Sequence, residues 1–487
     1  MADESESVTG MAGAGVWLGA AALFAIICVL INPVGYVGGG ADDQHYLAAA
    51  RCWVEAGAPC LPRDHWWSRW PIVGPVALSI KVFGDTRVAV GIGSLWSWVA
   101  ALVALGGLTA HWFGRRAGGI AVAAMAAVPI FTSYALTPDP NTAELAFQLG
   151  ALWAAAVAFD RQSRPMAILG GAFGGLAFLT RETSLVFLAA CAIFWLVLDK
   201  SRRRVLLWSI LGFIGVVAAE ILFYTLATGE PLYRYQLAMG HTGIPSRELP
   251  AGFDTNASPL FNPDYIRNWR REAGIHVFWP IDGWLNTLVT PNVGMIFWTA
   301  LLAFMVSRRE LSALDRWILT ALAVGAVAIA IGLTWVLAID PKSRMFVSAA
   351  CVAAMALGLC VVRSGKQATR ILVSFILAIW LAIGLSVIRD LPNNMALEEA
   401  ASRWLRTYEQ RIEVQAGART LLTFVPGTSN LPPQGAGEPY LMTLSTGRCD
   451  LLSRDKEGVS VIDEARASPR TEGRLCLFDR SKVGSSD

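Results

Sequence analysis

Residues 166–199 read MAILGGAFGGLAFLTRETSLVFLAACAIFWLVLD, two apolar runs separated by the polar step Arg181-Glu182. A membrane-spanning helix needs about 20 apolar residues, so each run is a short span on its own. The pair is either a tight helical hairpin or one broken helix. This choice decides the fold, because it inverts the side of the membrane on which every later segment lies.

The basic residues of the connecting loops favour the hairpin. Cytoplasmic loops collect Lys and Arg, so the charges test any alternation of spans that starts with the N-terminus inside. With a hairpin, the inner loops are all short and basic: 114–116, 160–164, 199–204, 307–309 and 363–370. With a single helix, the run Arg202-Arg203-Arg204 would face outward. The hairpin therefore sets the predicted topology.

We accordingly expect a polytopic all-α membrane protein with about eleven transmembrane helices. The expected spans are 14–35, 88–113, 117–136, 142–159, 166–180, 183–199, 205–228, 287–306, 317–338, 345–362 and 371–388. Composition agrees, since 54% of the 487 residues are hydrophobic and mean hydropathy is +0.48. Only 16% are charged, against about 25% in soluble proteins. A net charge of +3 gives no reason to expect a nucleic-acid partner.

The topology predicts three parts. Residues 1–13 form a cytoplasmic tail without the basic stretch of a cleavable signal peptide, so the first apolar segment reads as a retained span. Residues 14–388 form the transmembrane module, with outer loops 36–87 and 229–286. Residues 389–487 form a small extracytoplasmic domain of α and β structure, with strands expected at Leu421–Val425 and Arg474–Phe478. The expected location is the cell inner (plasma) membrane, with the C-terminus periplasmic or extracellular.

Two cysteine pairs fall on the predicted outer side, where disulfides form. Cys52 and Cys60 share the first outer loop, and Cys449 and Cys476 share the tail. Free thiols remain the alternative at this stage.

Two acidic sites also fall on this side. Asp42 and Asp43 open a stretch with helical spacing that includes Tyr46, Ala50 and Trp53. Asp139 lies in a turn, and Glu144 is expected in the first turn of the next helix. Helix capping is the simple explanation at both sites. Their shared face and similar depth instead favour one cleft.

Cationic residues gather on the same face. They are Arg69, Arg181 (followed by Glu182), Lys342 and Arg344. Arg suits a phosphate because its planar fork donates two parallel hydrogen bonds, whereas a single Arg is more often a snorkelling anchor. Trp66, Trp67 and Trp70 either stack on a sugar ring or belong to an interfacial aromatic belt.

The ordered set of motifs resembles the GT-C class of membrane glycosyltransferases. The branch it resembles is family 39-like and contains the protein O-mannosyltransferases and the lipid A aminoarabinose transferases. The motifs, spread over about positions 30–350, are Asp42-Asp43-Gln44-His45-Tyr46, Arg69-Trp70-Pro71-Ile72, Lys81-Val82-Phe83-Gly84-Asp85, Pro138-Asp139, Leu179-Thr180-Arg181 and Lys342-Ser343-Arg344-Met345-Phe346. The acidic pair is Asp-Asp where the family has Asp-Glu, which leaves open which carboxylate acts.

The resemblance implies transfer of a hexose or pentose from a polyprenyl-phosphate donor to a hydroxyl on lipid A, a polysaccharide or a protein. Asp42 or Asp43 would be the general base, which implies inversion at the sugar carbon. Arg69, Arg181 and Arg344 would stabilise the leaving phosphate. Tyr46, Glu182 and Lys342 would complete the binding site, while Asp139 and Glu144 would orient the acceptor or the sugar. These expected roles come from the resemblance, not from spacing.

No cofactor is implied with certainty, but a divalent metal at the acidic pair stays open, since some relatives of the class use one. Membrane lipids are expected partners. The competing class is a transporter or a lipid-linked sugar flippase, and a non-catalytic envelope assembly protein is a third. Transporters place ionisable residues near the bilayer midplane. Here such residues cluster at one face, with Glu220 as the nearest exception.

Overall fold

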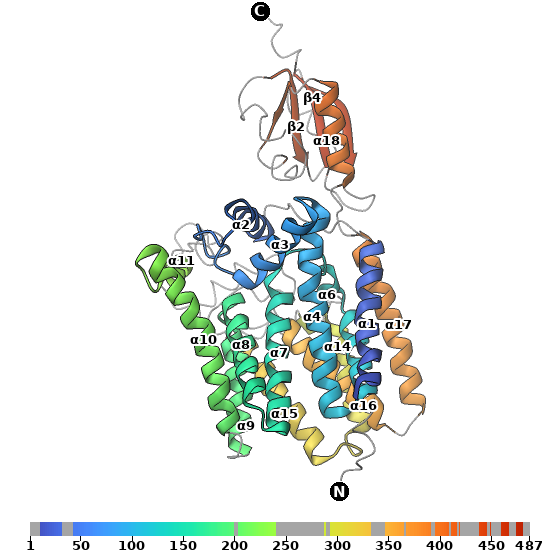
Figure 1. Ribbon diagram of the computed structural model, residues 1–487. Helices are drawn as coiled ribbons and strands as arrows, with labels where there is room; N and C mark the ends of the chain where they lie inside the picture. Colours follow the sequence, from blue (N-terminus) through green and yellow to red (C-terminus); the bar gives the residue numbers. More distant parts are fainter. Residues whose placement is uncertain are drawn as a thin grey trace, which may run out of the picture.

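The computed structural model describes residues 10–31, 42–198, 203–239, 287–288, 293–332, 346–364, 367–390, 395–408, 411–415, 418, 438–445, 449, 459–466 and 474–480. Helices dominate the N-terminal four-fifths of the chain, where they form an elongated bundle (Figure 1). They are α1 (Gly10–Ile31), α2 (Asp42–Ala56), α3 (Trp70–Phe83), α4 (Arg87–Phe113), α5 (Arg115–Ala126), α6 (Pro129–Ser133), α7 (Pro140–Arg161), α8 (Arg164–Thr180), α9 (Ser184–Leu198), α10 (Arg203–Thr228), α11 (Tyr233–Met239), α14 (Gly294–Ser307), α15 (Ala313–Ile331), α16 (Val347–Arg363) and α17 (Gln367–Asp390).

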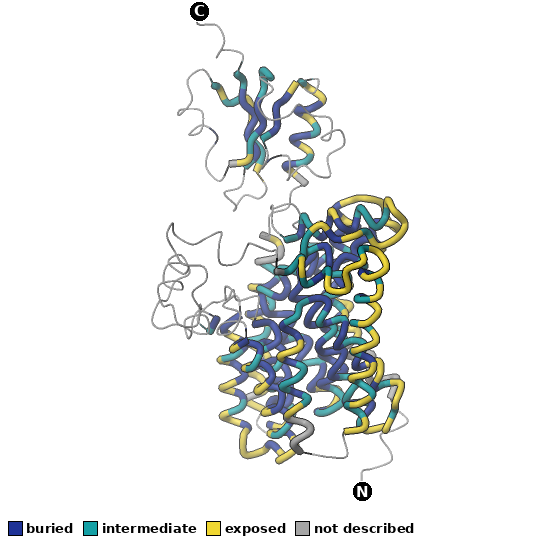
Figure 2. Tube along the Cα trace, turned by 90° about the vertical axis from the view of Figure 1, so that its left-hand side faces the viewer, coloured by how far each residue is buried: buried dark blue, intermediate teal, exposed yellow. Residues whose placement is uncertain are grey.

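The bundle has the surface of a membrane protein. Large apolar side chains point outward from its helices, on α10 for example Leu207, Leu211, Ile214, Leu222 and Leu226. Buried residues line the interior of the bundle (Figure 2). Among the described residues, α4, α7, α10 and α15 are long and apolar enough to cross a membrane by length and composition. Shorter apolar stretches lie in α1, α3, α8, α9, α14, α16 and α17, so the expected number of spans stays a prediction.

The predicted hairpin at Arg181 is confirmed. Helix α8 ends there because the backbone of Arg181 is extended, with φ −158° and ψ 127°. A Cβ on Gly171 would meet the Ser209 carbonyl, and one on Gly175 would meet Val216. The contact moves forward along both helices at once, from Gly171 and Ser209 to Gly175 and Val216. Helices α8 and α10 therefore run parallel. Helix α9 connects them in the chain and must therefore run antiparallel to both. One continuous helix over 166–199 could not reverse direction in this way.

Two expected segments differ in the structure. The single span expected at 117–136 is divided into α5 and the short α6, because Pro129 begins a new helix and cannot continue the old one. The loop expected at 36–87 contains the apolar helix α3. Helix α3 lies close to α4, since a Cβ on Gly93 would sit 2.7 Å from Val76 Cα.

The tail carries α18 (Met395–Thr407) and a four-stranded sheet in the order β1-β2-β4-β3. The strands are β1 (Ile412–Val414), β2 (Tyr440–Ser445), β3 (Ser460–Arg466) and β4 (Arg474–Asp479). Strand β1 pairs with β2 in parallel, and the other pairs are antiparallel. Strand β4 covers the strand expected at Arg474–Phe478, whereas Leu421–Val425 lies outside the described residues.

Three links join parts of the chain on this side of the bundle and in the tail. Disulfides join Cys52 of α2 to Cys60 in the loop that follows, and Cys449 to Cys476 in the tail. Arg87, the first residue of α4, is buried and forms an ion pair with Glu398 of α18. The tail domain therefore lies above the end of the bundle where α2 and α3 also lie (Figure 1).

Candidate active site

The predicted acidic pair begins α2. Both residues lie in its first turn, as expected, with Asp42 half-buried and Asp43 buried. Asp42 has no hydrogen bond or ion pair with any residue in the described ranges, whereas Asp43 is engaged with its surroundings. Tyr46 lies one helical turn after Asp42 and so shares its face of α2. The two carboxylates thus differ in burial and in their contacts. Of the two, Asp42 is the one that no described residue binds, so it is the better candidate to meet a ligand.

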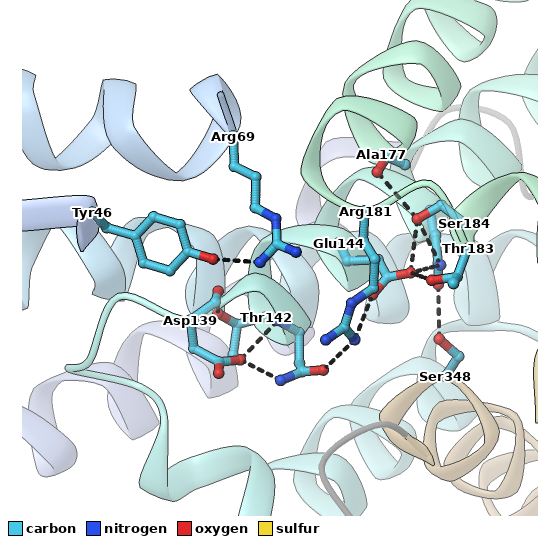
Figure 3. Close-up of polar contacts among 12 residues, drawn as sticks. Tyr46, Arg69, Asp139, Thr142, Glu144, Ala177, Arg181, Thr183, Ser184 and Ser348 are labelled. Atoms are coloured by element: carbon cyan, nitrogen blue, oxygen red, sulfur yellow. Dashed lines mark hydrogen bonds and ion pairs between the residues drawn. The ribbon is translucent and has the colours of Figure 1, made fainter. Parts of the chain in front are cut away.

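Tyr46 and Arg69 form the first polar pair of the site. Arg69 Nη1 donates a hydrogen bond of 2.6 Å to the Tyr46 hydroxyl oxygen (Figure 3). Tyr46 is fully buried, and burial raises its pKa to about 12, helped by the nearby Asp42 and Asp139 and opposed by Arg69. The phenol therefore stays neutral at physiological pH. It fixes one corner of the Arg69 guanidinium without neutralising its charge.

The loop that precedes Arg69 is held by a second polar pair, His45 and Asp64. His45 Nδ1 lies 2.7 Å from Asp64 Oδ2, and Asp64 Oδ1 accepts the backbone amides of Trp66 and Trp67 at 2.9 and 3.1 Å. The hydrogen bond that His45 donates to Asp64 raises the pKa of His45, against a lowering by burial. Because His45 adjoins Tyr46 in α2, the pair ties the helix of the acids to the loop of Arg69.

Trp66 and Trp67 of this loop, and Trp70 at the start of α3, pack against other side chains of the protein. The Trp66 ring lies 4.1 Å from the His45 ring and 3.8 Å from the His65 ring, measured between centroids. Trp67 is buried, and Trp70 packs edge-on against Phe223 at 4.8 Å. The geometry therefore gives these rings a packing role, and stacking on a sugar gains no support from it.

Asp139 caps a helix, as the simpler of the two explanations drawn from the sequence predicts. It is the N-cap of α7, and its Oδ1 accepts both the backbone amide and the side-chain Nδ2 of Asn141 at 2.7 Å. Asn141 Oδ1 in turn accepts 2.8 Å from Arg181 Nη1. The cap thus continues into a chain of hydrogen bonds that reaches Arg181, and Asn141 is a member that sequence reasoning missed.

Glu144 does not lie in the first turn of its helix, contrary to expectation, because α7 begins at Pro140 and Glu144 falls one turn further on. It is 4% exposed and accepts hydrogen bonds from four side chains: Gln148 (3.0 Å), Arg181 (3.4 Å), Thr183 (3.3 Å) and Ser184 (2.8 Å). Gln148 also accepts 2.8 Å from Ser348 of α16. Glu144 is therefore the centre of a buried network that orients Arg181 (Figure 3).

Arg69 and Arg181 use their guanidinium groups in the same way. Each forms its hydrogen bonds to described residues through Nη1 alone. In Figure 3 both side chains extend toward the region of Asp139, Arg69 from above and Arg181 from the right. Within the described part of the chain, their remaining nitrogens have no acceptor and are available to an anion in that region.

Glu182 has a partner that sequence reasoning missed. Its Oε1 accepts two hydrogen bonds from Arg234 of α11, at 3.1 and 2.8 Å, while its side chain stays 41% exposed. Burial raises the pKa of Glu182, but Arg234 outweighs this and holds it below the usual value. Arg234 also bonds Glu220 at 2.9 Å. The sequence signal for it was Glu220 itself, since an acid within an apolar helix needs a cationic partner.

Lys342 and Arg344 lie outside the described residues; the structure resumes at Phe346, immediately before α16. No group of three or more His, Cys, Asp or Glu side chains within the described ranges could hold a metal ion. A divalent metal at the acidic pair therefore stays a prediction.

The predicted resemblance to the GT-C membrane glycosyltransferases is confirmed by comparison with known proteins. Residues 71–227 match the family model described as dolichyl-phosphate-mannose-protein mannosyltransferase. No curated protein sequence matches the chain.

Solved structures share the fold. ArnT from Cupriavidus metallidurans in the apo state is 12% identical with a TM-score of 0.57, and the match covers 99% of this chain and 100% of that one. The form bound to undecaprenyl phosphate is 11% identical with a TM-score of 0.55 and the same coverage. Oligosaccharyltransferase AglB from Archaeoglobus fulgidus, in complex with an inhibitory peptide and a dolichol-phosphate, is 14% identical with a TM-score of 0.51, covering 88% and 69%. At these identities the likeness shows the fold alone.

Proposed function

We propose that this protein transfers a sugar from a polyprenyl-phosphate donor to a hydroxyl acceptor at the outer face of the cell inner membrane. The observation that carries the proposal is that Arg69 and Arg181 extend toward one region (Figure 3), with Asp42 close to Arg69 and without a hydrogen bond or ion pair to any described residue. Two arginines suited to a phosphate, near a carboxylate that has no described partner, supply the groups that such a transfer requires. The fold shared with ArnT, solved with undecaprenyl phosphate, and with AglB, solved with a dolichol-phosphate, supports a lipid-phosphate donor.

The arginines serve the leaving group. As the sugar departs, negative charge builds on the lipid phosphate. Donors held in place before the reaction stabilise that charge without reorganising. Tyr46 holds Arg69, and Asn141 with Glu144 holds Arg181, each through Nη1. Asp139 and Glu144 therefore contribute by orienting Arg181, a more indirect role than orienting the acceptor.

Asp42 serves the acceptor. A hydroxyl must lose its proton as it attacks, and a carboxylate within hydrogen-bond reach can take that proton. Asp42 is half-buried and has no described hydrogen-bond partner, whereas Asp43 is buried and engaged. The difference in surroundings favours Asp42 as the base and Asp43 as a residue that supports the start of α2.

The proposed step is a single displacement. The acceptor oxygen forms a bond to the anomeric carbon as the bond from that carbon to the phosphate oxygen breaks. The acceptor proton goes to Asp42, and the bonding electrons leave with the polyprenyl phosphate. Attack opposite the leaving group inverts the configuration at the anomeric carbon. The sugar, and whether the acceptor belongs to a lipid, a polysaccharide or a protein, are for the assay to identify.

The test compares Asp42→Asn, Asp43→Asn and the control Asp160→Asn in membranes supplied with labelled polyprenyl-phosphate sugars. Asp160 is a suitable control because it is an exposed carboxylate that lies near His111, at the other ends of α4 and α7 from the proposed site. Loss of a general base typically costs 10²–10⁴ in rate, so Asp42→Asn should fall by roughly 10²-fold or more. Asp43→Asn should retain more activity than Asp42→Asn, and the control should retain full activity.

Full transfer by both Asp42→Asn and Asp43→Asn would refute the role given to the acidic pair. The same vesicles distinguish the competing class. If labelled lipid crosses the membrane while its sugar is never transferred, the protein is a flippase or transporter and the proposed function is wrong.

A further inference from the structure

Arg234 is the most heavily bonded cation that the described residues contain. It belongs to the short helix α11, and its side chain is 2% exposed. Nε and Nη2 donate to Glu182 Oε1, and Nη1 donates to Glu220 Oε1 at 2.9 Å. Backbone carbonyls take the rest, with Ser68 at 3.3 Å from Nη1 and Leu179 at 3.0 Å from Nη2. All three nitrogens are thus engaged, so Arg234 has no donor to spare for a substrate.

The partners of Arg234 adjoin the two arginines of the proposed site. Ser68 immediately precedes Arg69 in the chain. Leu179 and Glu182 lie on either side of Arg181. One guanidinium therefore connects the loop of the first arginine to the helix break of the second, although the two segments are far apart in sequence. A planar guanidinium fixes such a connection more closely than a flexible ammonium, because its donors have fixed relative directions.

The electrostatics make Arg234 hard to replace. Glu220 is 2% exposed, so its carboxylate depends on Arg234 for a countercharge. Removing one partner of a buried pair is costly because the other charge stays buried alone. Burial lowers the pKa of Arg234, but Glu182 and Glu220 together raise it further, so the guanidinium remains charged.

We propose that Arg234 is a positioning residue that sets Arg69 and Arg181 at the separation required to bind one lipid-linked phosphate. The inference rests on the proposed function, because it assigns the two arginines to the same phosphate. Arg234 itself touches neither donor nor acceptor. Its effect on the reaction passes through the two arginines that it aligns.

The experiment measures affinity for undecaprenyl phosphate, which needs no turnover, in purified full-length protein in nanodiscs. The variants are Arg234→Met, Arg234→Lys and the milder Glu182→Gln, which removes a charge but keeps the shape of the side chain. Arg363→Met is the matched control, since it breaks an ion pair with buried Asp315 between α15 and α16 at the opposite end of the bundle. Thermal unfolding is followed for every variant.

We expect Arg234→Met to weaken binding of undecaprenyl phosphate by roughly tenfold or more, which is about 1.4 kcal/mol. Lys should restore part of the affinity, and Glu182→Gln should weaken it more mildly. Arg363→Met should lower the unfolding temperature and leave the affinity unaltered. If Arg234→Met does not fold, Glu182→Gln carries the test.

A double-substitution cycle isolates the coupling. If Arg234 acts through Arg181, the effects of Arg234→Lys and Arg181→Met on affinity should be less than additive. Additive effects, or equal losses of affinity in Arg234→Met and Arg363→Met, would overturn the inference. A wild-type protein that binds undecaprenyl phosphate but transfers no sugar would defeat the proposed function while leaving this inference intact.

Discussion

The hydrogen bond between Tyr46 and Arg69 gives a direct test of how the site is built. Tyr46→Phe removes one oxygen and keeps the ring, so the buried packing around α2 and α3 is preserved. What is lost is a 2.6 Å hydrogen bond to a charged guanidinium. Bonds of that kind contribute about 1.5–3 kcal/mol. Since Arg69 is only half-buried and water can replace part of the loss, the lower end of that range is expected.

A loss of about 1.4 kcal/mol corresponds to a tenfold change in an equilibrium constant. We therefore expect Tyr46→Phe to raise the KM for the polyprenyl-phosphate sugar roughly tenfold, with a smaller change in the KM for the acceptor. The matched control is Tyr233→Phe, which removes a hydrogen bond of 3.1 Å to the Pro62 carbonyl but leaves Arg69 untouched. Steady-state kinetics in nanodiscs measure both variants. An unchanged donor KM in Tyr46→Phe, or an equal change in Tyr233→Phe, would refute the reasoning.

Two further predictions concern packing and pH. Gly212→Ala should destabilise the bundle by about 1–3 kcal/mol, because the new Cβ would lie 2.0 Å from the Ile168 carbonyl oxygen. The control is Gly215→Ala on the same helix, where a Cβ has open space, and this variant should unfold at the wild-type temperature or above. The raised pKa of His45 predicts stability that is complete below its ordinary value of 6.5 and is lost as pH rises through the higher folded value. Unfolding temperatures measured from pH 5 to 9 should therefore fall less with rising pH in His45→Gln than in the wild type, and two parallel profiles would contradict the role given to the pair with Asp64.

The course of the chain was predictable because it depends on patterns that the sequence displays directly. Lengths of apolar segments and loop charges place the helices and their alternation, and they were enough to choose the hairpin at Arg181. Pro129 is visible in the sequence, but the apolar pattern around it predicts a single span over 117–136. Hydropathy averages over a window, so a single proline inside a uniformly apolar stretch does not change it.

The network of the site was less predictable, because it depends on which side chains meet across helices. Glu144 and Arg181 were selected for their charge and face. Their connectors, Asn141, Ser184 and Gln148, are ordinary polar residues whose importance appears only when α7 and α9 lie side by side. Arg234 was missed for the same reason, since a lone Arg after a span is usually an interfacial anchor.

The ion pair between Arg87 and Glu398 has a consequence for the evolution of the tail. Arg87 begins α4, a helix long and apolar enough to cross a membrane, and is 4% exposed. The carboxylate that it meets nevertheless belongs to a domain more than three hundred residues later in the chain. A buried charge tolerates the loss of its partner poorly. Deleting the tail, or exchanging it for an unrelated domain, should therefore destabilise the start of α4 unless a compensating change occurs there. Substitutions at these two positions should appear together among descendants of this chain.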